Sequence, residues 1–472
     1  MDVIENFMSG RTFRLVYYGN LILWGLVVMF LVLFIILELV KDSSRPQKPT
    51  ARSESIELLV PDMKEILLWG YQGRGVKINV TRLFPGHLEE LEDGFLKYNL
   101  NKYLSDRMSM RRPLPDVRDE ECRQMDIEVT QLPSVSVVVA FRNEPRTTLL
   151  RMLFSVIDRS PVEVLDEIIL VDDGTEVEDL QYPRLEHYLS SLKKVSILRL
   201  TTPLGMAQAM MQGARKATGD VVVFLQPRCE CTEGWLPPLL LAIVTDFSTV
   251  AVPLVDTIDS NTFQYDPVAL QDVMVGSFTW ELVASKRALA RALENATLNA
   301  FTPVITDGIF ALTRDNLFKL GGFDDGLTVD EIVNIEFSFR SWLCGSQVVL
   351  VPCSHVGYIS PRASAHQPGI FSEARLRDSA RVAERWMGTY GSFVHERLPS
   401  PKGEHPSRAS ETLPKDNASC MSFDWFMQNL EPSRAFPEEI QRRGWLVVVD
   451  SYNRMLNLEV RGQLCCLSAV LS

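Results

Sequence analysis

The stretch VSVVVAF, residues 135–141, decides the fold class, because it is a nearly continuous apolar run. Such a run is typical of a parallel strand that is buried on both faces of a sheet. Apolar residues then recur at helical spacing between Leu149 and Ile157. The alternation continues, and we expect further strands at 168–171, 195–200 and 221–225 and further helices at 180–192, 206–217 and 334–343. This alternation predicts an α/β fold around a nucleotide-binding sheet, with a less regular region at 245–305.

The ends of two of these strands draw attention to a possible site. In open α/β sheets, ligands bind beyond the carboxyl ends of the strands. The second strand ends in Asp172-Asp173, but the fourth ends in Gln226-Pro-Arg228, followed by Cys-Glu-Cys. No carboxylate stands directly at the tip of the fourth strand. The sequence therefore predicts a site at this edge, with an amide and a guanidinium at the tip of the fourth strand.

The composition and the N-terminus limit the class of protein. The chain has 472 residues and a net charge of −12, which argues against nucleic-acid binding because such proteins need a basic face. Residues 15–37 carry no charge and are long enough to span a bilayer. A cleaved signal peptide is the alternative, but its apolar core would be shorter. We expect a membrane anchor.

The charges that flank the span do not decide its orientation. Three N-glycosylation sequons, at Asn79, Asn295 and Asn417, all follow the span, and eight cysteines permit a few disulfides in an oxidising lumen. We therefore expect a luminal body. The expected parts are a cytoplasmic tail (1–14), the anchor (15–37), a stem and N-terminal luminal segment (38–131), a nucleotide-binding half (132–245), an acceptor-side half (246–396), a linker (397–419) and a short C-terminal segment (420–472).

A set of ordered motifs resembles the polypeptide N-acetylgalactosaminyltransferases. The matching segments are LPDVR (114–118), SVVVAFRNE (136–144), LLRMLFSVI (149–157), EIILVDD (167–173), CECTEGW (229–235), NIEFSFR (334–340), CSHVG (353–357) and WF (425–426). The resemblance implies a GT-A (Rossmann-like) domain in a single-pass type II Golgi membrane protein. It also implies transfer of GalNAc from UDP-GalNAc to Ser or Thr of polypeptides, and a C-terminal lectin domain that is absent or a remnant in 420–472.

The resemblance further implies two disulfides, Cys122–Cys353 and Cys344–Cys420, with Cys229 and Cys231 left unpaired. Buried free thiols are the alternative for the four bridged cysteines.

The positions at which the family binds manganese are occupied here by residues that do not suit a metal. The Asp-x-His of the family corresponds to Gln226 and Arg228, and its later His to Tyr358. Arginine has no acceptor to offer a cation, so we expect no metal cofactor. The glutamate of the family falls on Val333, although Asn334 is retained. Two family arginines that contact the donor fall on Pro203 and Pro361, the latter with Arg362 beside it.

Part of the nucleotide pocket is retained, namely Ala140, Asp172 and Asp173. These residues either contact uridine and ribose or only close the ends of their strands. Asp330 and Glu331 either supply a replacement metal site or form an exposed acidic turn.

Two functions follow. The first is a pseudoenzyme that binds or regulates in the Golgi, with UDP, UDP-GalNAc, an acceptor polypeptide or another glycosyltransferase as its partner. The second is an active transferase in which Arg228 replaces the metal, since a guanidinium can bind phosphate.

Overall fold

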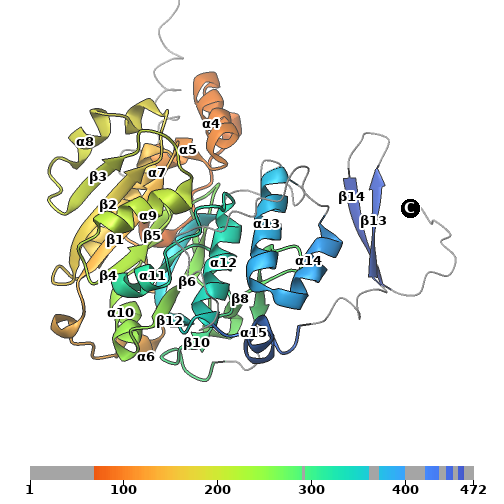
Figure 1. Ribbon diagram of the computed structural model, residues 1–472. Helices are drawn as coiled ribbons and strands as arrows, with labels where there is room; N and C mark the ends of the chain where they lie inside the picture. The colour runs from red at the N-terminus through yellow and green to blue at the C-terminus, as the bar shows by residue number, and fades with distance from the viewer. Residues whose placement is uncertain are drawn as a thin grey trace, which may run out of the picture. The chain divides into compact units, whose positions relative to one another are not determined.

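The computed structural model describes residues 69–289, 293–360, 372–398, 420–434, 443–449 and 455–461 (Figure 1). The expected anchor at 15–37, most of the expected linker, Asn417, Pro361 and Arg362 lie outside these residues. Within the described part of the chain, no helix is long and apolar enough to cross a membrane.

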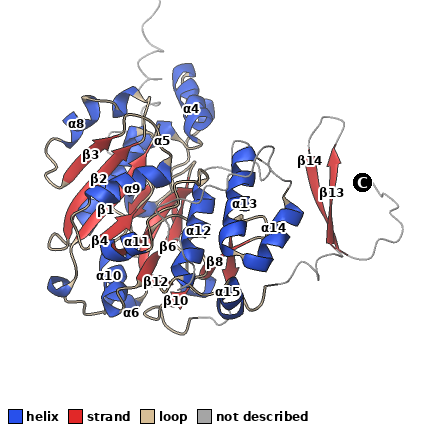
Figure 2. Ribbon diagram, in the orientation of Figure 1, coloured by secondary structure: helices blue, strands red, loops and turns tan. Residues whose placement is uncertain are grey.

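A mixed ten-stranded sheet forms the centre of the domain, and the four strands expected from the sequence form one half of it. These are β1 (Val135–Phe141), β2 (Leu165–Asp172), β3 (Val195–Arg199) and β4 (Val221–Phe224). They are parallel and lie in the order β4-β1-β2-β3 (Figure 2). The predicted α/β architecture is confirmed.

The other half of the sheet is mixed. Its strands are β5 (Cys229–Cys231), β6 (Thr249–Asp259), β7 (Tyr265–Asp266), β10 (Ala300–Phe301), β11 (Phe310–Thr313) and β12 (Gln347–Ser360). β11 runs antiparallel to β4, whereas β6 and β12 run parallel to each other. β6 was not predicted from the sequence, because Pro253 interrupts its apolar run. The proline is accommodated beside a register shift between Val351 and His355 of β12.

Helices cover both faces of this sheet, and β1 shows how the core is divided. Val137 and Val139 belong to one buried cluster, whereas Val138 and Ala140 belong to the other, as the alternation of side chains along a strand requires. The first cluster includes residues of α7 (Arg146–Arg159) and α10 (Leu236–Thr245), and the second includes residues of α9 (Met206–Lys216) and α12 (Asp330–Leu343).

The other helices are α4 (Pro85–Tyr98), α5 (Lys102–Arg107), α6 (Glu120–Arg123), α8 (Arg184–Leu189), α11 (Arg314–Lys319), α13 (Glu373–Trp386), α14 (Gly391–Arg397) and α15 (Phe423–Leu430). Two hairpins, β8–β9 (Met274–Phe278 and Ala284–Ala288) and β13–β14 (Arg443–Val449 and Met455–Arg461), stand outside the main sheet. The helix expected at 180–192 is shorter, since α8 begins only after Pro183.

Both expected disulfides are present, and Cys229 and Cys231 are free and buried. The Cys344–Cys420 bond joins the end of α12 to the segment before α15. Phe426 of α15 is fully buried, with its ring centroid 5.0 Å from that of Phe339 on α12. The start of the expected C-terminal segment is therefore part of the core of the domain.

Candidate functional site

A pocket of about 400 Å³ lies where β1, β2 and β4 end. β1 and β4 are parallel neighbours with Val138 opposite Phe224, so the residues that follow each strand emerge at the same edge. The pocket is lined by Arg142, Glu144, Asp173, Gly205, Met206, Gln226, Pro227, Arg228, Thr328, Asp330 and Tyr358. This edge is where the sequence predicted a site.

The three positions that correspond to the metal ligands of the family come together in this pocket. Gln226 and Arg228 follow β4, and Tyr358 reaches the pocket from β12. Tyr358 lies opposite Cys229 in the antiparallel pairing of β12 with β5, and the backbone N–H of Ile359 donates to the carbonyl of Arg228 at 3.1 Å. Backbone pairing therefore holds Arg228 and Tyr358 side by side, and Gln226 lies two residues before Arg228.

The guanidinium of Arg228 is bound by groups of the protein itself. Its Nε donates to Glu144 Oε2 at 2.7 Å, and its Nη1 donates to the carbonyl oxygen of Tyr98 at 3.0 Å. The side chains of Arg228 and Glu144 are only 15% and 14% exposed. The positive charge at this ligand position is therefore compensated by a carboxylate.

Glu144 was not among the predicted site residues. The available signal was its place three residues after β1, because the ends of neighbouring parallel strands meet at one edge of a sheet. Its partner could not be inferred without knowing that β4 lies next to β1.

The amide of Gln226 lies close to Gly308, where a larger residue would contact it. Gly308 has a φ of +64°, and a Cβ at this position would lie 2.8 Å from Gln226 Nε2 and 3.2 Å from Asn334 Nδ2. The retained Asn334 is 9% exposed and lies near Gln226 at this glycine. Val333, at the position of the family glutamate, is 2% exposed and belongs to the apolar core, so it offers the pocket no polar group.

Tyr358 is held as a neutral phenol. Burial raises its pKa to about 12, although the nearby charge of Arg228 acts in the opposite direction. A neutral phenol can exchange hydrogen bonds with a ligand, but it is a poor ligand for a divalent cation.

The predicted nucleotide residues divide into one that lines the pocket and two that do not. Asp173 lines it, and its carboxylate accepts hydrogen bonds from the backbone N–H groups of Leu204 and Gly205, at 2.6 and 3.1 Å. Asp172 instead accepts from the backbone N–H of Thr175 at 2.8 Å and is ion-paired with Arg199. Ala140 is 1% exposed and belongs to the core. Thus Asp172 closes its own turn.

Asp330 also lines the pocket, whereas Glu331 does not. The pKa of Asp330 is raised to about 6, first because neighbouring protein atoms displace water from the carboxylate and second because of the negative charge of Asp173. A hydrogen bond from the backbone of Ala207 acts in the opposite direction. Glu331 accepts from the backbone N–H of Ala284 at 2.6 Å and is ion-paired with Arg375.

A replacement metal site was one of the two alternatives for Asp330 and Glu331. Both carboxylates line the second pocket described below, and Glu331 is already paired there with Arg375. As far as the structure describes the chain, no three His, Cys, Asp or Glu side chains are grouped so that they could hold a metal ion.

A second pocket, of about 710 Å³, adjoins the first, since Thr328 and Asp330 line both. Its lining includes Lys286, whose Nζ lies 2.9 Å from Asp307 Oδ2. This pocket belongs to the half that the sequence assigned to the acceptor.

Comparisons with known proteins show what the chain is similar to. A family model described as Glycosyl transferase family 2 matches residues 136–317. Polypeptide N-acetylgalactosaminyltransferase 13 of Rattus norvegicus is 32% identical, and the match covers 94% of this chain and 80% of that protein. The chain belongs to the polypeptide N-acetylgalactosaminyltransferase family. Polypeptide N-acetylgalactosaminyltransferase 4 of Mus musculus is 36% identical, and the match covers 80% of this chain but 64% of that protein.

The chain also shares the fold of the N-acetylgalactosaminyltransferase family. A crystal structure of GalNAc-T7 with UDP, GalNAc and Mn²⁺ superposes with a TM-score of 0.68 at 30% identity, covering 77% of this chain and 67% of that one. The family and its GT-A fold, both expected from the motifs, are therefore confirmed. This member spans under two thirds of the length of some of its relatives, 60% for polypeptide N-acetylgalactosaminyltransferase 5 of Caenorhabditis elegans.

Proposed function

We propose that this N-acetylgalactosaminyltransferase homologue is a Golgi luminal protein that binds or regulates without manganese-dependent transfer. The observation that carries the proposal is the ion pair between Arg228 and Glu144, at 2.7 Å, in the place of a metal ligand. Manganese prefers carboxylate, carbonyl and imidazole ligands. Of the three positions only Gln226 has a carbonyl oxygen, and the other two hold a guanidinium and a neutral phenol. The set of residues therefore does not fit the metal, and no step is derived through it.

The charges of the pocket support the same proposal. Transfer from UDP-GalNAc releases a diphosphate, whose charge must be neutralised as the bond to the sugar breaks. The pocket has two arginines, Arg142 and Arg228, against three carboxylates, Glu144, Asp173 and Asp330. One of the arginines is already paired. Little positive charge is therefore left for the leaving group.

The partners proposed for this protein are UDP or UDP-GalNAc, an acceptor polypeptide, or another glycosyltransferase. The two adjoining pockets of about 400 and 710 Å³ support the first two, because they offer polar groups at the expected edge of the sheet. The proposed location, a single-pass type II protein of the Golgi membrane, is what the family resemblance implies. The uncharged run at 15–37 would supply the anchor.

The test is release of UDP by the full-length protein from UDP-GalNAc with a Ser/Thr-rich mucin-type peptide, in manganese and in EDTA. We expect no release above that of a protein-free blank in either condition. Binding of UDP is measured in parallel by thermal shift, and we expect manganese to leave that shift unchanged. Manganese-stimulated release of UDP would refute the proposal.

The alternative function is metal-independent transfer with Arg228 in the role of the cation. It is favoured by one observation, that Arg228 lines the pocket. The guanidinium would have to share its charge between Glu144 and a phosphate. This alternative requires turnover that resists EDTA, is abolished by Arg228→Ala and survives Arg184→Ala, a matched change at an exposed ion pair.

A further inference from the structure

Two N-glycosylation sequons lie within the described residues, and their local hydrogen bonding is the same. The Oδ1 of Asn79 accepts from the backbone N–H and the hydroxyl of Thr81, at 3.2 and 2.7 Å. The Oδ1 of Asn295 accepts from the same groups of Thr297, at 2.7 and 2.9 Å. The conformation of the asparagine therefore does not distinguish the two sites.

Their surroundings differ. Asn79, Val80 and Thr81 are all exposed, and Val80 is 50% exposed. In the second sequon the asparagine is half-buried, and Ala296 between Asn295 and Thr297 is only 1% exposed. The first sequon can leave the protein surface at little cost, whereas the second is held to it by its middle residue.

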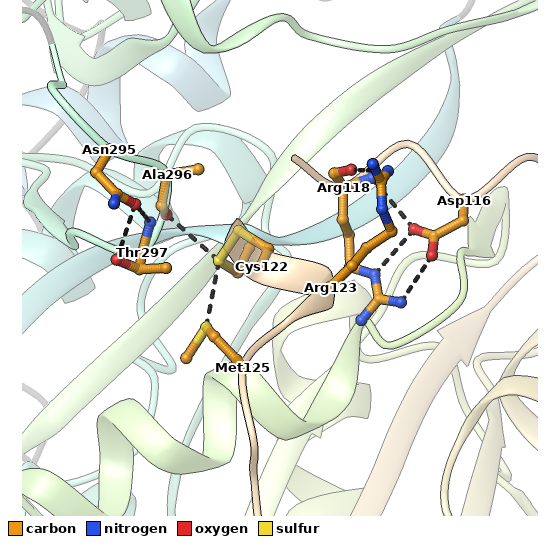
Figure 3. The surroundings of a disulfide bond; sticks show 9 residues. Asp116, Arg118, Cys122, Arg123, Met125, Asn295, Ala296 and Thr297 are labelled. Carbon is orange, nitrogen blue, oxygen red and sulfur yellow. Dashed lines mark hydrogen bonds and ion pairs between the residues drawn. A yellow bond between two sulfur atoms is a disulfide. The ribbon is translucent and has the colours of Figure 1, made fainter. Parts of the chain in front are cut away.

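The group that holds the second sequon is a disulfide. Ala296 forms a small buried cluster with Cys122 of α6 and Cys353 of β12. The Cys353 Sγ lies 3.4 Å from the carbonyl oxygen of Ala296 and 3.6 Å from the Met125 sulfur (Figure 3). The two half-cystines cover Ala296. Because their bond joins α6 to β12 covalently, this cover over Ala296 persists when the chain fluctuates locally.

We propose that Asn295 accepts an N-linked glycan only while the Cys122–Cys353 disulfide is open, whereas Asn79 accepts one whether or not that bond has formed. The inference rests on the luminal placement proposed above. An enzyme that modifies a sequon must hold its three residues in its own cleft, and Ala296 can leave its cluster only when α6 and β12 can separate. The state of the disulfide would thus control a modification site.

The two reactions that compete are chemically complete. In glycosylation, the Nδ2 of Asn295 forms a bond to C1 of a lipid-diphosphate-linked oligosaccharide, the C1–O bond to the diphosphate breaks, the lipid diphosphate leaves, and Nδ2 loses one proton. In closure, the two thiols give two electrons and two protons to a disulfide-bearing oxidoreductase by exchange. Neither reaction needs a residue from either of the two pockets described above.

The order of synthesis leaves time for the competition. Cys353 follows Ala296 by 57 residues. At about 5–20 residues per second, it is made about 3–11 s after the sequon. The glycan on Asn295 must be added within this interval or before the oxidant acts, so its occupancy should be partial.

The experiment measures the occupancy of each sequon by mass spectrometry after enzymatic deglycosylation, on the full chain expressed in mammalian cells. Cys122→Ser and Cys353→Ser each prevent closure. Cys344→Ser is the matched control, because it removes the other disulfide and leaves the cover over Ala296 intact. Thr81→Ala and Thr297→Ala assign the signals by removing one sequon each.

We expect Asn295 to be less occupied than Asn79 in the natural sequence and to rise to the level of Asn79 in Cys122→Ser and Cys353→Ser but not in Cys344→Ser. Brief treatment of the cells with a thiol reductant should produce the same rise without any mutation. Equal occupancy of both sites in the natural sequence would overturn the inference, as would no response to Cys122→Ser or an equal response to Cys344→Ser. If both sites stay empty in every variant, the luminal placement fails and the inference fails with it. If Asn79 is occupied and Asn295 does not respond, only the inference fails.

Discussion

Arg228 binds Glu144 through a hydrogen bond of 2.7 Å between Nε and Oε2, and this contact joins the ends of β4 and β1 across the pocket. A second donation from Arg228, to the carbonyl of Tyr98, ties the C-terminal end of α4 to the same point. Arg228, at a position where the family has a metal ligand, thus connects β4, β1 and α4.

Replacement of Arg228 by Ala should therefore destabilise the protein. The change leaves the carboxylate of Glu144, 14% exposed, without its partner, which we expect to cost about 1–3 kcal/mol in the free energy of unfolding. Denaturant unfolding measures this loss. Arg184→Ala is the control, since Arg184 is 50% exposed in its pair with Glu178 and should change the stability by less than about 1 kcal/mol. Equal losses in the two variants would show that the Arg228 pair contributes no more than a surface contact.

Restoring the family residues should recover metal binding if only the ligands have changed. The variant carries Gln226→Asp, Arg228→His, Tyr358→His and Val333→Glu. Because positions 226, 228 and 358 already line one pocket, we expect manganese to raise the melting temperature of this variant but not that of the natural sequence.

A version with Val333→Glu alone is the control, and it should not respond to the metal. No response in the complete variant would mean that the geometry around the pocket has diverged as well as the ligands.

Gly308→Ala should disturb the packing behind Gln226. Alanine at a φ of +64° is strained by about 1–2 kcal/mol, and its Cβ would also lie 2.8 Å from Gln226 Nε2. Gly345→Ala has a positive φ of +91° but meets nothing within 4 Å, so it isolates the strain from the contact. We expect a lower melting temperature for Gly308→Ala than for Gly345→Ala. The reverse order would mean that Gln226 moves aside freely.

Asp330 should make stability depend on pH between about 4 and 6. Its pKa is 3.8 in the unfolded chain and about 6 in the folded protein, so between these values the folded state holds a proton that the unfolded state has lost. The contribution of Asp330 to stability therefore falls as the pH rises through this window and changes no further above it. The side chain is exposed to the pocket, so solvent screening should keep the effect below about 1 kcal/mol.

Asp330→Asn should remove this fall, which melting temperatures measured from pH 4 to pH 7 would reveal. Asp325→Asn, at an exposed position outside the pocket, serves as the comparison and should retain the natural profile. Identical profiles for all three proteins would contradict the assignment.

The helix α15 should prove essential to the domain. Phe426 is fully buried among aromatic rings, and its truncation to Ala should cost about 3–5 kcal/mol. Met421→Ala, at a residue that is 54% exposed, should change the stability by about 0.5 kcal/mol or less. Chemical unfolding of both variants gives the comparison. A small loss for Phe426→Ala would indicate that α15 only lies on the surface of the domain.

The sequence predicted those parts of the fold in which local pattern and tertiary environment agree. β1 and β4 are continuous apolar runs, and the structure buries them on both faces. β6 was not predicted, because Pro253 at its centre is unfavourable in a strand and is tolerated only beside an irregularity in the neighbouring strand. The helix expected from Asn334 begins earlier, at Asp330, where two acidic residues suit the positive end of the helix dipole.

The candidate site was predictable only in part, for a similar reason. Motif order assigned Gln226, Arg228 and Tyr358 to one site, and the structure brings them to one pocket. The contact between Arg228 and Glu144 depends on which strand is next to β4. The second partner of Arg228, the carbonyl of Tyr98, belongs to the segment 38–131, in which no individual helix was predicted. Periodicity describes a single element and says nothing of the register between two of them.

The bond between Cys344 and Cys420 also sets the route by which mechanical load enters the domain. Tension on the chain beyond α15 would reach Cys420 and cross directly to Cys344 at the end of α12, since a covalent link carries force before any looser path does. This covalent path bypasses the stretch between the two cysteines, which are 76 positions apart in the sequence. A pull from the C-terminal side would therefore pass through α15 and this bond to the helix that carries Asp330, at the wall of the pocket.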